Sequence, residues 1–194
     1  MTQRNSSEKF FFDSDFRLEE QLPRQFSVTF NEVDTDKVQV LFNESYQIGD
    51  IINDNSYQND FYRYHDIFHY TFAAILGWSP CARAMIKCKR KSDRLMDEVE
   101  DGARAAITEE AISLLIFNEA RKKDFFKNIQ NVSNTTLQII KEMTEPFEVK
   151  VRTRKEWNVA ILKAYEMFRL LSKNRGGKVI FDAFSQNVAY LPLT

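Results

Sequence analysis

Residues 60–80 read DFYRYHDIFHYTFAAILGWSP, and this stretch decides much of the fold. Apolar residues recur at helical spacing as far as Leu76. Gly77 then favours a helix end, and Ser79-Pro80 favours the start of the next helix. We therefore predict one helix over about 60–76 and a second over about 80–91.

Outward from this stretch, the pattern indicates further elements on both sides. Phe26, Val28 and Phe30 alternate with polar residues, and a similar alternation near Val40 predicts a β-hairpin over 26–42. Periodic segments predict a helix over about 94–123 that kinks or breaks near Gly102, and further helices over 135–143 and 154–174. Alternating apolar residues near the end predict a C-terminal hairpin over 178–191.

These elements predict a mainly α fold, in which a helical core over 60–174 forms a bundle with small flanking β-hairpins at the N- and C-terminal ends. Only 5 Gly and 4 Pro interrupt the chain, which suits long helices. Residues 1–22 are polar and acidic apart from a Phe triplet at 10–12, so we expect an N-terminal tail that is suited to docking a protein partner. Residues 23–194 then form a single domain.

Composition excludes several classes of protein. The net charge of −1 gives no support for duplex nucleic-acid binding, which needs an excess of cations. No apolar run is long enough to cross a membrane or to serve as an export signal. Cys81 and Cys88 lie seven residues apart on one predicted helix, about 10 Å along its axis, which is too far for a disulfide. We therefore expect reduced thiols and a cytoplasmic location.

The two histidines of the chain, His65 and His69, lie four residues apart on the first predicted helix and share one face, which Asp66 borders. Two imidazoles beside a carboxylate are what a divalent metal site on a helix requires. The alternative is that the histidines are satisfied by hydrogen bonds alone, and for this group of three we favour metal binding.

A second acidic group lies on the long predicted helix, where Glu98, Asp101, Ala105 and Glu109 follow one another at spacings that fall on one stripe. Unpaired carboxylates on one face repel one another unless a cation binds there. The alternative is a solvated charged face. Oxygen ligands favour Mg²⁺ or Mn²⁺, and imidazole ligands also admit Zn²⁺ or Fe²⁺. A cationic run over 83–91 would hold a polyphosphate near such a metal, although capping of a helix end explains any one of its members equally well.

Several blocks in order resemble the C-terminal domain of bacterial MazG-like proteins. They include Tyr62 to His69, Leu76 to Pro80, Lys89 to Ser92, Asp97 to Gly102 and Lys173 to Gly177. The resemblance implies an all-α, dimeric, metal-dependent enzyme that cleaves nucleoside triphosphates to a monophosphate and pyrophosphate. The family pairs Glu-x-x-Glu on one helix with Glu-x-x-Asp on a later one, and Glu98-x-x-Asp101 matches the second pair. Asp66-x-x-His69 replaces the first pair, which departs from the family pattern.

Two hypotheses follow from the resemblance. In the first, the chain is a nucleoside triphosphate pyrophosphohydrolase that uses Mg²⁺ or Mn²⁺. Asp66, His69, Glu98 and Asp101 bind the metal, His65 and Glu109 orient or deprotonate water, and the substrate phosphates contact Arg63, Lys87, Arg90 and Lys91. In the second, the chain is a non-catalytic nucleotide-sensing or protein-interaction module with a structural metal site. An HD-type phosphohydrolase requires more histidines than the two present.

Overall fold

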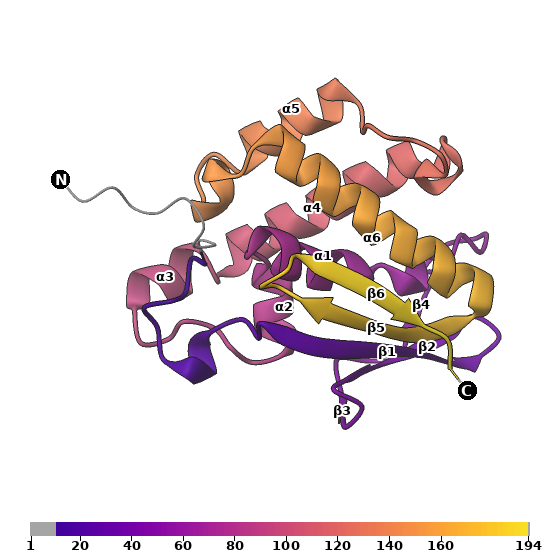
Figure 1. Ribbon diagram of the computed structural model, residues 1–194, viewed down its shortest axis with the longest axis horizontal. Coiled ribbons are helices and arrows are strands. Elements are labelled where there is room, and N and C mark those ends of the chain that lie inside the picture. The colour runs from indigo at the N-terminus through magenta and orange to yellow at the C-terminus, as the bar shows by residue number, and fades with distance from the viewer. Residues whose placement is uncertain (1–10, 194) are drawn as a thin grey trace.

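The computed structural model describes residues 11–193 as an α+β fold (Figure 1). Short 3-10 helices lie at 18–20, 62–64, 124–126 and 148–151. The α-helices and strands have these bounds: α1 Asp66–Leu76, α2 Pro80–Met85, α3 Arg94–Val99, α4 Ala103–Arg121, α5 Asn134–Met143, α6 Arg154–Asn174, β1 Gln25–Asp34, β2 Lys37–Phe42, β3 Tyr46–Gln47, β4 Ile52–Asn53, β5 Gly176–Asp182 and β6 Asn187–Leu191.

The two hairpins belong to one antiparallel sheet, in the order β3-β2-β1-β5-β6 with β4 paired to the other end of β2. β1 is the shared strand, because Val28 lies opposite Phe42 of β2 on one side and Val179 of β5 on the other. The prediction of a helical bundle with only small separate hairpins is therefore wrong. Each hairpin was visible in the local alternation, but the pairing that joins them connects opposite ends of the chain.

One face of the sheet forms the floor of the core. Phe26, Val28, Phe30, Val179 and Phe181 all point to this face and are buried. Stacking continues across the strands, since the rings of Phe26 and Phe181 lie 4.6 Å apart. The other face carries more exposed residues, as expected for an antiparallel sheet that is covered on one side.

Gly177 allows the close approach of β5 and β6. It has a φ of +150°, and a Cβ atom at this position would lie 2.2 Å from a ring carbon of Tyr190. The Tyr190 hydroxyl donates a hydrogen bond to the carbonyl of Gly176 at 3.0 Å. The pair Gly176-Gly177, which follows the last helix, is therefore used within the sheet.

α1 and α6 pack against the sheet, and α4 and α5 form a further layer beyond them (Figure 1). Every residue of α1 is buried. Its Phe68 ring stacks on Tyr165 of α6 at 4.8 Å, and Phe72 meets Trp157 edge-on at 5.4 Å. α1 is thus the central helix of the fold, which fixes the direction of every side chain that it carries.

The helix boundaries that surround α1 follow the expected signals. Gly77 ends α1 with a φ of 70°, and the Ser79 side chain accepts a hydrogen bond from the amide of Ala82 to begin α2. α2 is shorter than the range 80–91, because it ends at Met85 and Lys87 adopts a φ of +60°.

The break predicted near Gly102 in the helix over 94–123 is confirmed, since α3 ends at Val99 and α4 begins at Ala103. A Cβ atom at Gly102 would lie 2.1 Å from the carbonyl oxygen of Glu98, so the chain can turn this closely only at a glycine. Glu98 and Asp101 consequently do not continue the face that Ala105 and Glu109 present on α4.

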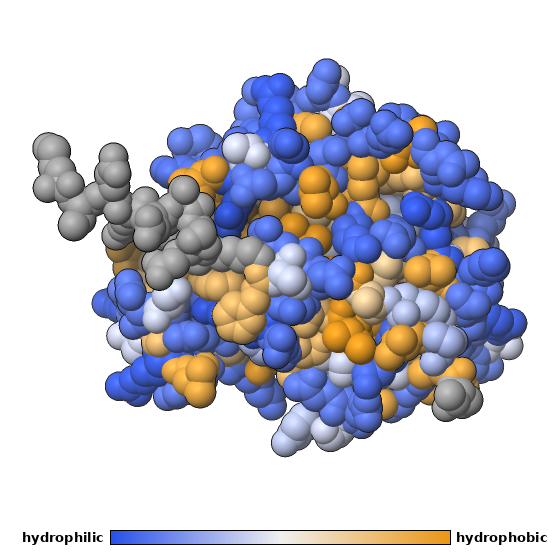
Figure 2. Space-filling model, in the orientation of Figure 1, coloured by the Kyte–Doolittle hydropathy of each residue, from blue (hydrophilic) through white to orange (hydrophobic). Residues whose placement is uncertain are grey.

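Residues 11–22, the described part of the expected tail, pack against the domain, and Asp13 is buried there. Residues 1–10, which include Phe10 of the triplet, lie outside the described residues. The face of the molecule in Figure 2 is mainly hydrophilic, with small hydrophobic patches separated by polar residues. Among the described residues, no helix has the length and hydropathy required to span a membrane.

Candidate metal centre

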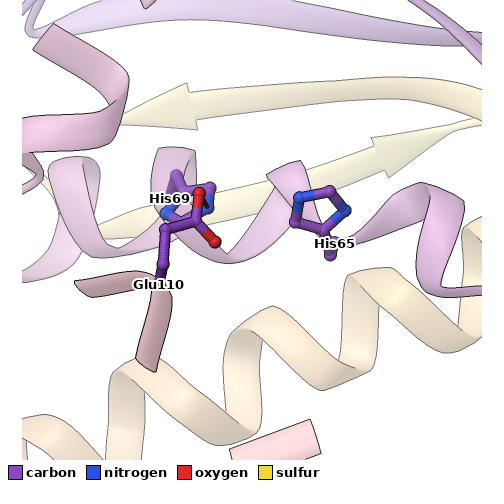
Figure 3. Close-up of side chains that lie close together, drawn as sticks. All are labelled: His65, His69 and Glu110. Carbon is purple, nitrogen blue, oxygen red and sulfur yellow. Dashed lines mark ion pairs between the residues drawn. The ribbon is translucent and has the colours of Figure 1, made fainter. Parts of the chain in front are cut away.

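The start of α1 and the middle of α4 bring together His65, His69 and Glu110, which we call the histidine cluster. Figure 3 shows both imidazoles on one side of α1 and the Glu110 side chain extending from α4 toward His69. The Nε2 atom of His69 lies 3.4 Å from Oε1 of Glu110. One ligand atom from each of the three residues lies within 4.8 Å of the other two.

Hydrogen bonds at Nδ1 orient both imidazoles. Nδ1 of His65 lies 2.9 Å from the carbonyl oxygen of Tyr62, and Nδ1 of His69 lies 2.8 Å from Oε1 of Glu109. Both partners are acceptors, so each Nδ1 carries a proton, and each Nε2 faces a carboxylate oxygen, that of Asp66 for His65 and that of Glu110 for His69. A metal-binding histidine is typically held in this way. Nε2 of His69 is buried and has no hydrogen-bond partner among the described residues.

Glu109 is fully buried and makes its contacts inside the protein. Besides His69, its carboxylate accepts hydrogen bonds from the Ser79 hydroxyl at 2.7 Å and from the amide of Cys81 at 2.9 Å. These contacts tie α4 to the start of α2. Glu109 therefore orients His69, which differs from its predicted position beside a reacting water.

Electrostatics at the cluster favour a positive charge. Burial is the largest influence on the pKa of His69 and lowers it, but Glu109 and Cys81 together outweigh burial and hold that pKa well above its usual range. The imidazole of His69 in turn lowers the pKa of Glu110. Burial raises the pKa of the Cys81 thiol to about 12, and Glu109 adds to that effect. Cys81 is therefore a neutral thiol, and a proton or a metal can occupy the space between Nε2 of His69 and Glu110.

Asp66 and Tyr62 border the histidine cluster. Oδ1 of Asp66 lies 3.3 Å from Nε2 of His65, and the Tyr62 ring stacks on the His65 ring at 4.3 Å. Tyr62 also lines a cavity of about 190 Å³, together with Asp60, Leu114 and Arg121. A small polar group would fit this cavity, and Arg121, which pairs with Asp60 at 3.2 Å, is its cation.

Asp101 is separate from the histidine cluster and belongs to a buried charge network, formed by Asp13, Arg83, Asp101, Arg90 and Glu148. Arg90 binds both oxygens of Asp101, at 2.7 Å and 3.1 Å, and also contacts Glu148 at 2.8 Å. Arg83 joins Asp13 at 2.6 Å to Asp101 at 3.5 Å. Two guanidinium groups therefore neutralise Asp101 and leave its oxygens no room for a metal.

Glu98 lies on the exposed side of α3, where it pairs with Arg94 at 2.8 Å. The structure thus brings His65, Asp66, His69 and Glu109 of the sequence-predicted residues together, and it does not bring Glu98 or Asp101 to them. A metal held by Asp66, His69, Glu98 and Asp101 does not fit this arrangement. A metal held by the histidine cluster does, because an orphaned imidazole nitrogen and a half-exposed carboxylate face one another.

The predicted phosphate-binding cations have different positions. Arg63 is buried, and its side chain contacts Asp54 at 3.1 Å and Glu32 at 3.5 Å. Arg90 lies in the buried charge network. Lys87 and Lys91 are exposed, and Lys87 lines a different cavity at the end of α2.

Sequence reasoning missed Glu110 as a site residue, together with Ser79 and Cys81 as supports. Glu110 follows Glu109 directly, but adjacent helical residues point in directions that differ by about 100°. Only the packing of α1, α2 and α4 decides which of the two faces the Nε2 atom of His69.

Comparison with known proteins identifies one family. The family described as MazG C-terminal domain matches residues 7–194, which confirms the resemblance drawn from the sequence. Neither a curated protein nor a solved structure shows a significant match to the chain.

Proposed function

The chain belongs to the MazG C-terminal domain family, which is related to nucleoside triphosphate pyrophosphohydrolases, and we propose that it is itself a metal-dependent enzyme of this type. The histidine cluster holds the metal, and the substrate is cleaved to a nucleoside monophosphate and pyrophosphate. One observation carries the proposal: Nε2 of His69 faces Glu110, a ligand atom of His65 lies within 4.8 Å of a ligand atom of each of them, and hydrogen bonds at Nδ1 hold both imidazoles.

The donor set indicates which metal the site prefers. Two imidazoles and one carboxylate favour Mn²⁺, Zn²⁺ or Fe²⁺ over Mg²⁺, which prefers oxygen ligands. Because the pKa of His69 is raised, a metal would have to displace a proton from its Nε2 atom. We propose Mn²⁺ as the working metal, because it binds imidazole and phosphate oxygens alike. A bound metal of this kind polarises a phosphate oxygen and lowers the pKa of a coordinated water.

The residues of the chain then have distinct roles. His65, His69 and Glu110 bind the metal, and Glu109 holds the imidazole of His69 in place through Nδ1. Asp66 lies beside Nε2 of His65, where it can accept a proton from water or add a ligand. Arg121 of the neighbouring cavity supplies a positive charge toward the phosphates.

A panel of nucleoside triphosphates with Mn²⁺, Zn²⁺ or Mg²⁺ tests the proposal, with pyrophosphate and orthophosphate assayed in parallel. We expect pyrophosphate release with Mn²⁺ and its loss in His65→Ala and Glu110→Gln. Glu98→Ala is the matched control, since it removes a carboxylate of the original prediction, and it should retain wild-type activity.

The second candidate is a non-catalytic module with a structural metal site. It is favoured by the fact that Asp101 and Glu109 are engaged by internal partners, which leaves few carboxylates for phosphoryl chemistry. A wild-type protein that binds Mn²⁺ but releases neither pyrophosphate nor phosphate from any nucleotide would establish this candidate and overturn the enzyme.

A further inference from the structure

A second cavity, of about 330 Å³, lies between the β2–β3 turn and the end of α2. The turn projects from the edge of the sheet (Figure 1). The walls of this cavity are aromatic and aliphatic, and its cation is a lysine. Its lining includes Phe42, Tyr46, Ile48, Met85, Ile86 and Lys87.

The backbone at Lys87 is unusual. α2 ends in a Schellman motif. The amide of Cys88 donates a hydrogen bond to the carbonyl of Arg83 at 3.0 Å, and the amide of Lys87 donates one to the carbonyl of Ala84 at 3.4 Å. Lys87 occupies the left-handed position of this motif with a φ of +60°, where glycine is the usual residue. Backbone geometry at this position therefore favours glycine, and the chain has lysine there.

No ion pair within residues 11–193 engages the ammonium group of Lys87. Its side chain is exposed, and it lines the cavity together with Phe42 and Tyr46. An ammonium group binds a phosphate or carboxylate, and exposed ring faces stack on a planar aromatic group. The lining therefore matches a ligand that combines an aromatic ring with an anionic group.

The volume of the cavity limits which ligands it can hold. Small-molecule sites have volumes of about 300–1,000 Å³, so this cavity lies at the lower end of that range. A nucleoside monophosphate has the required ring and anion, and stacking of a base on an aromatic side chain is a general means of binding nucleotides. A triphosphate chain would require more cations than the one lysine.

This cavity is separate from the histidine cluster. The first turn of α2 contacts Glu109, whereas the last turn reaches the cavity. Six residues of helix separate the two ends by about 9 Å, and the two sites share no residue. We propose that the cavity between the β2–β3 turn and α2 is a second site, which binds a nucleoside monophosphate with its base against Tyr46 and its phosphate on Lys87.

Titration of isotope-labelled protein with AMP and UMP, followed by NMR in the presence of EDTA, tests this site. We expect saturable shifts at residues that line the cavity. Adenosine, which lacks the charge, and ribose 5-phosphate, which lacks the ring, should each bind about tenfold more weakly than AMP.

Substitutions of the residues that line the cavity test where AMP binds. Lys87→Met should reduce AMP affinity to the level of adenosine, and Tyr46→Ala should reduce it to the level of ribose 5-phosphate. Lys87→Gly should weaken AMP binding as much as Lys87→Met does. It should also raise the thermal midpoint of unfolding, because glycine adopts the positive φ at this position without strain. Glu98→Ala, which alters an exposed residue outside both sites, should bind AMP as the wild type does. Absence of saturable shifts with both nucleotides, or unchanged AMP affinity in Lys87→Met, would each overturn the proposal.

Discussion

The buried charge network has five charged side chains and the histidine cluster has three titratable ones, and the two regions differ in their basic groups. In the network, Arg83 and Arg90 face the carboxylates directly, and Asp13 and Asp101 are almost fully buried. In the cluster, the cationic groups are imidazoles, and the Glu110 side chain is 49% exposed. Arginine remains protonated at every relevant pH, whereas imidazole can lose its proton and bind a metal.

This difference teaches how to distinguish structural from chemical acids in one protein. A carboxylate that is held by a buried guanidinium is already neutralised, and its removal affects stability. A carboxylate that faces an orphaned imidazole nitrogen at the surface has capacity for a further ligand. Substitutions in the two regions should therefore have separable effects.

The largest effect is expected at the centre of the network. Arg90→Met leaves Asp101 and Glu148 buried without their partner, and we expect a loss of about 3–5 kcal/mol in the free energy of unfolding. Urea denaturation measures this loss.

Arg94→Met is the matched control, because it removes an arginine whose ion pair with Glu98 is exposed. It should leave the midpoint of denaturation close to that of the wild type, since exposed ion pairs contribute little. Equal stability of the two variants would show that the network is not structural.

The next effect concerns the support of the cluster. Glu109→Gln places an amide opposite Nδ1 of His69, and we expect Mn²⁺ affinity to fall by about 10–100-fold, as is usual when the partner of a ligand is lost. Isothermal titration calorimetry measures the affinity, and near-ultraviolet circular dichroism verifies the fold. An unchanged affinity would mean that the orientation of His69 is irrelevant to the metal.

A smaller effect is expected beside the network, at Glu100. Burial raises its pKa to about 7, and the nearby charge of Glu148 adds to the shift. Since the folded pKa exceeds the unfolded value of 4.5, the stabilising contribution of Glu100 is complete below pH 4.5 and is lost as pH rises through about 7.

Glu100→Gln should therefore stabilise the protein at pH 8 by about 1 kcal/mol, after allowance for solvent screening, and have little effect at pH 4.5. Thermal unfolding of both proteins from pH 4.5 to 8 measures the difference. A constant difference across this range would contradict the assigned titration.

The smallest effect is expected at Glu98, which the sequence placed in the metal site. Glu98→Ala should change the free energy of unfolding by less than about 0.5 kcal/mol. Mn²⁺ should raise the thermal midpoint of unfolding of Glu98→Ala by the same amount as that of the wild type. If Mn²⁺ does not raise the midpoint of Glu98→Ala, Glu98 is a ligand of the metal after all.

Much of the fold was predictable because its signals are local. The alternation near Val28 and the sequence Gly77 to Pro80 mark elements at their observed positions. The complete sheet was not predictable in this way, because Gln25 pairs with Asp182 and no local pattern encodes a partner at that distance. The resemblance to an all-α superfamily reinforced the wrong expectation.

The residues of the candidate site were likewise predictable only where local sequence determines their position. His65 and His69 share one helical face whatever the tertiary structure, so their proximity followed from the four-residue spacing. Asp101 was assigned to the same site because one stripe was drawn from Glu98 to Glu109 across the break expected near Gly102, and because Glu98-x-x-Asp101 matches the second pair of the family. Glu110 depends on how α4 packs against α1, which periodicity does not determine.

The central claim is that the metal belongs to His65, His69 and Glu110, and a Mn²⁺ titration followed by electron paramagnetic resonance tests it most directly. Wild type, Glu110→Gln and Glu98→Ala are compared at one pH after treatment with EDTA and desalting. We predict one Mn²⁺ site per chain in the wild type and in Glu98→Ala, and its loss in Glu110→Gln. A wild type that binds no Mn²⁺, or a site that survives in Glu110→Gln and disappears in Glu98→Ala, would contradict the account.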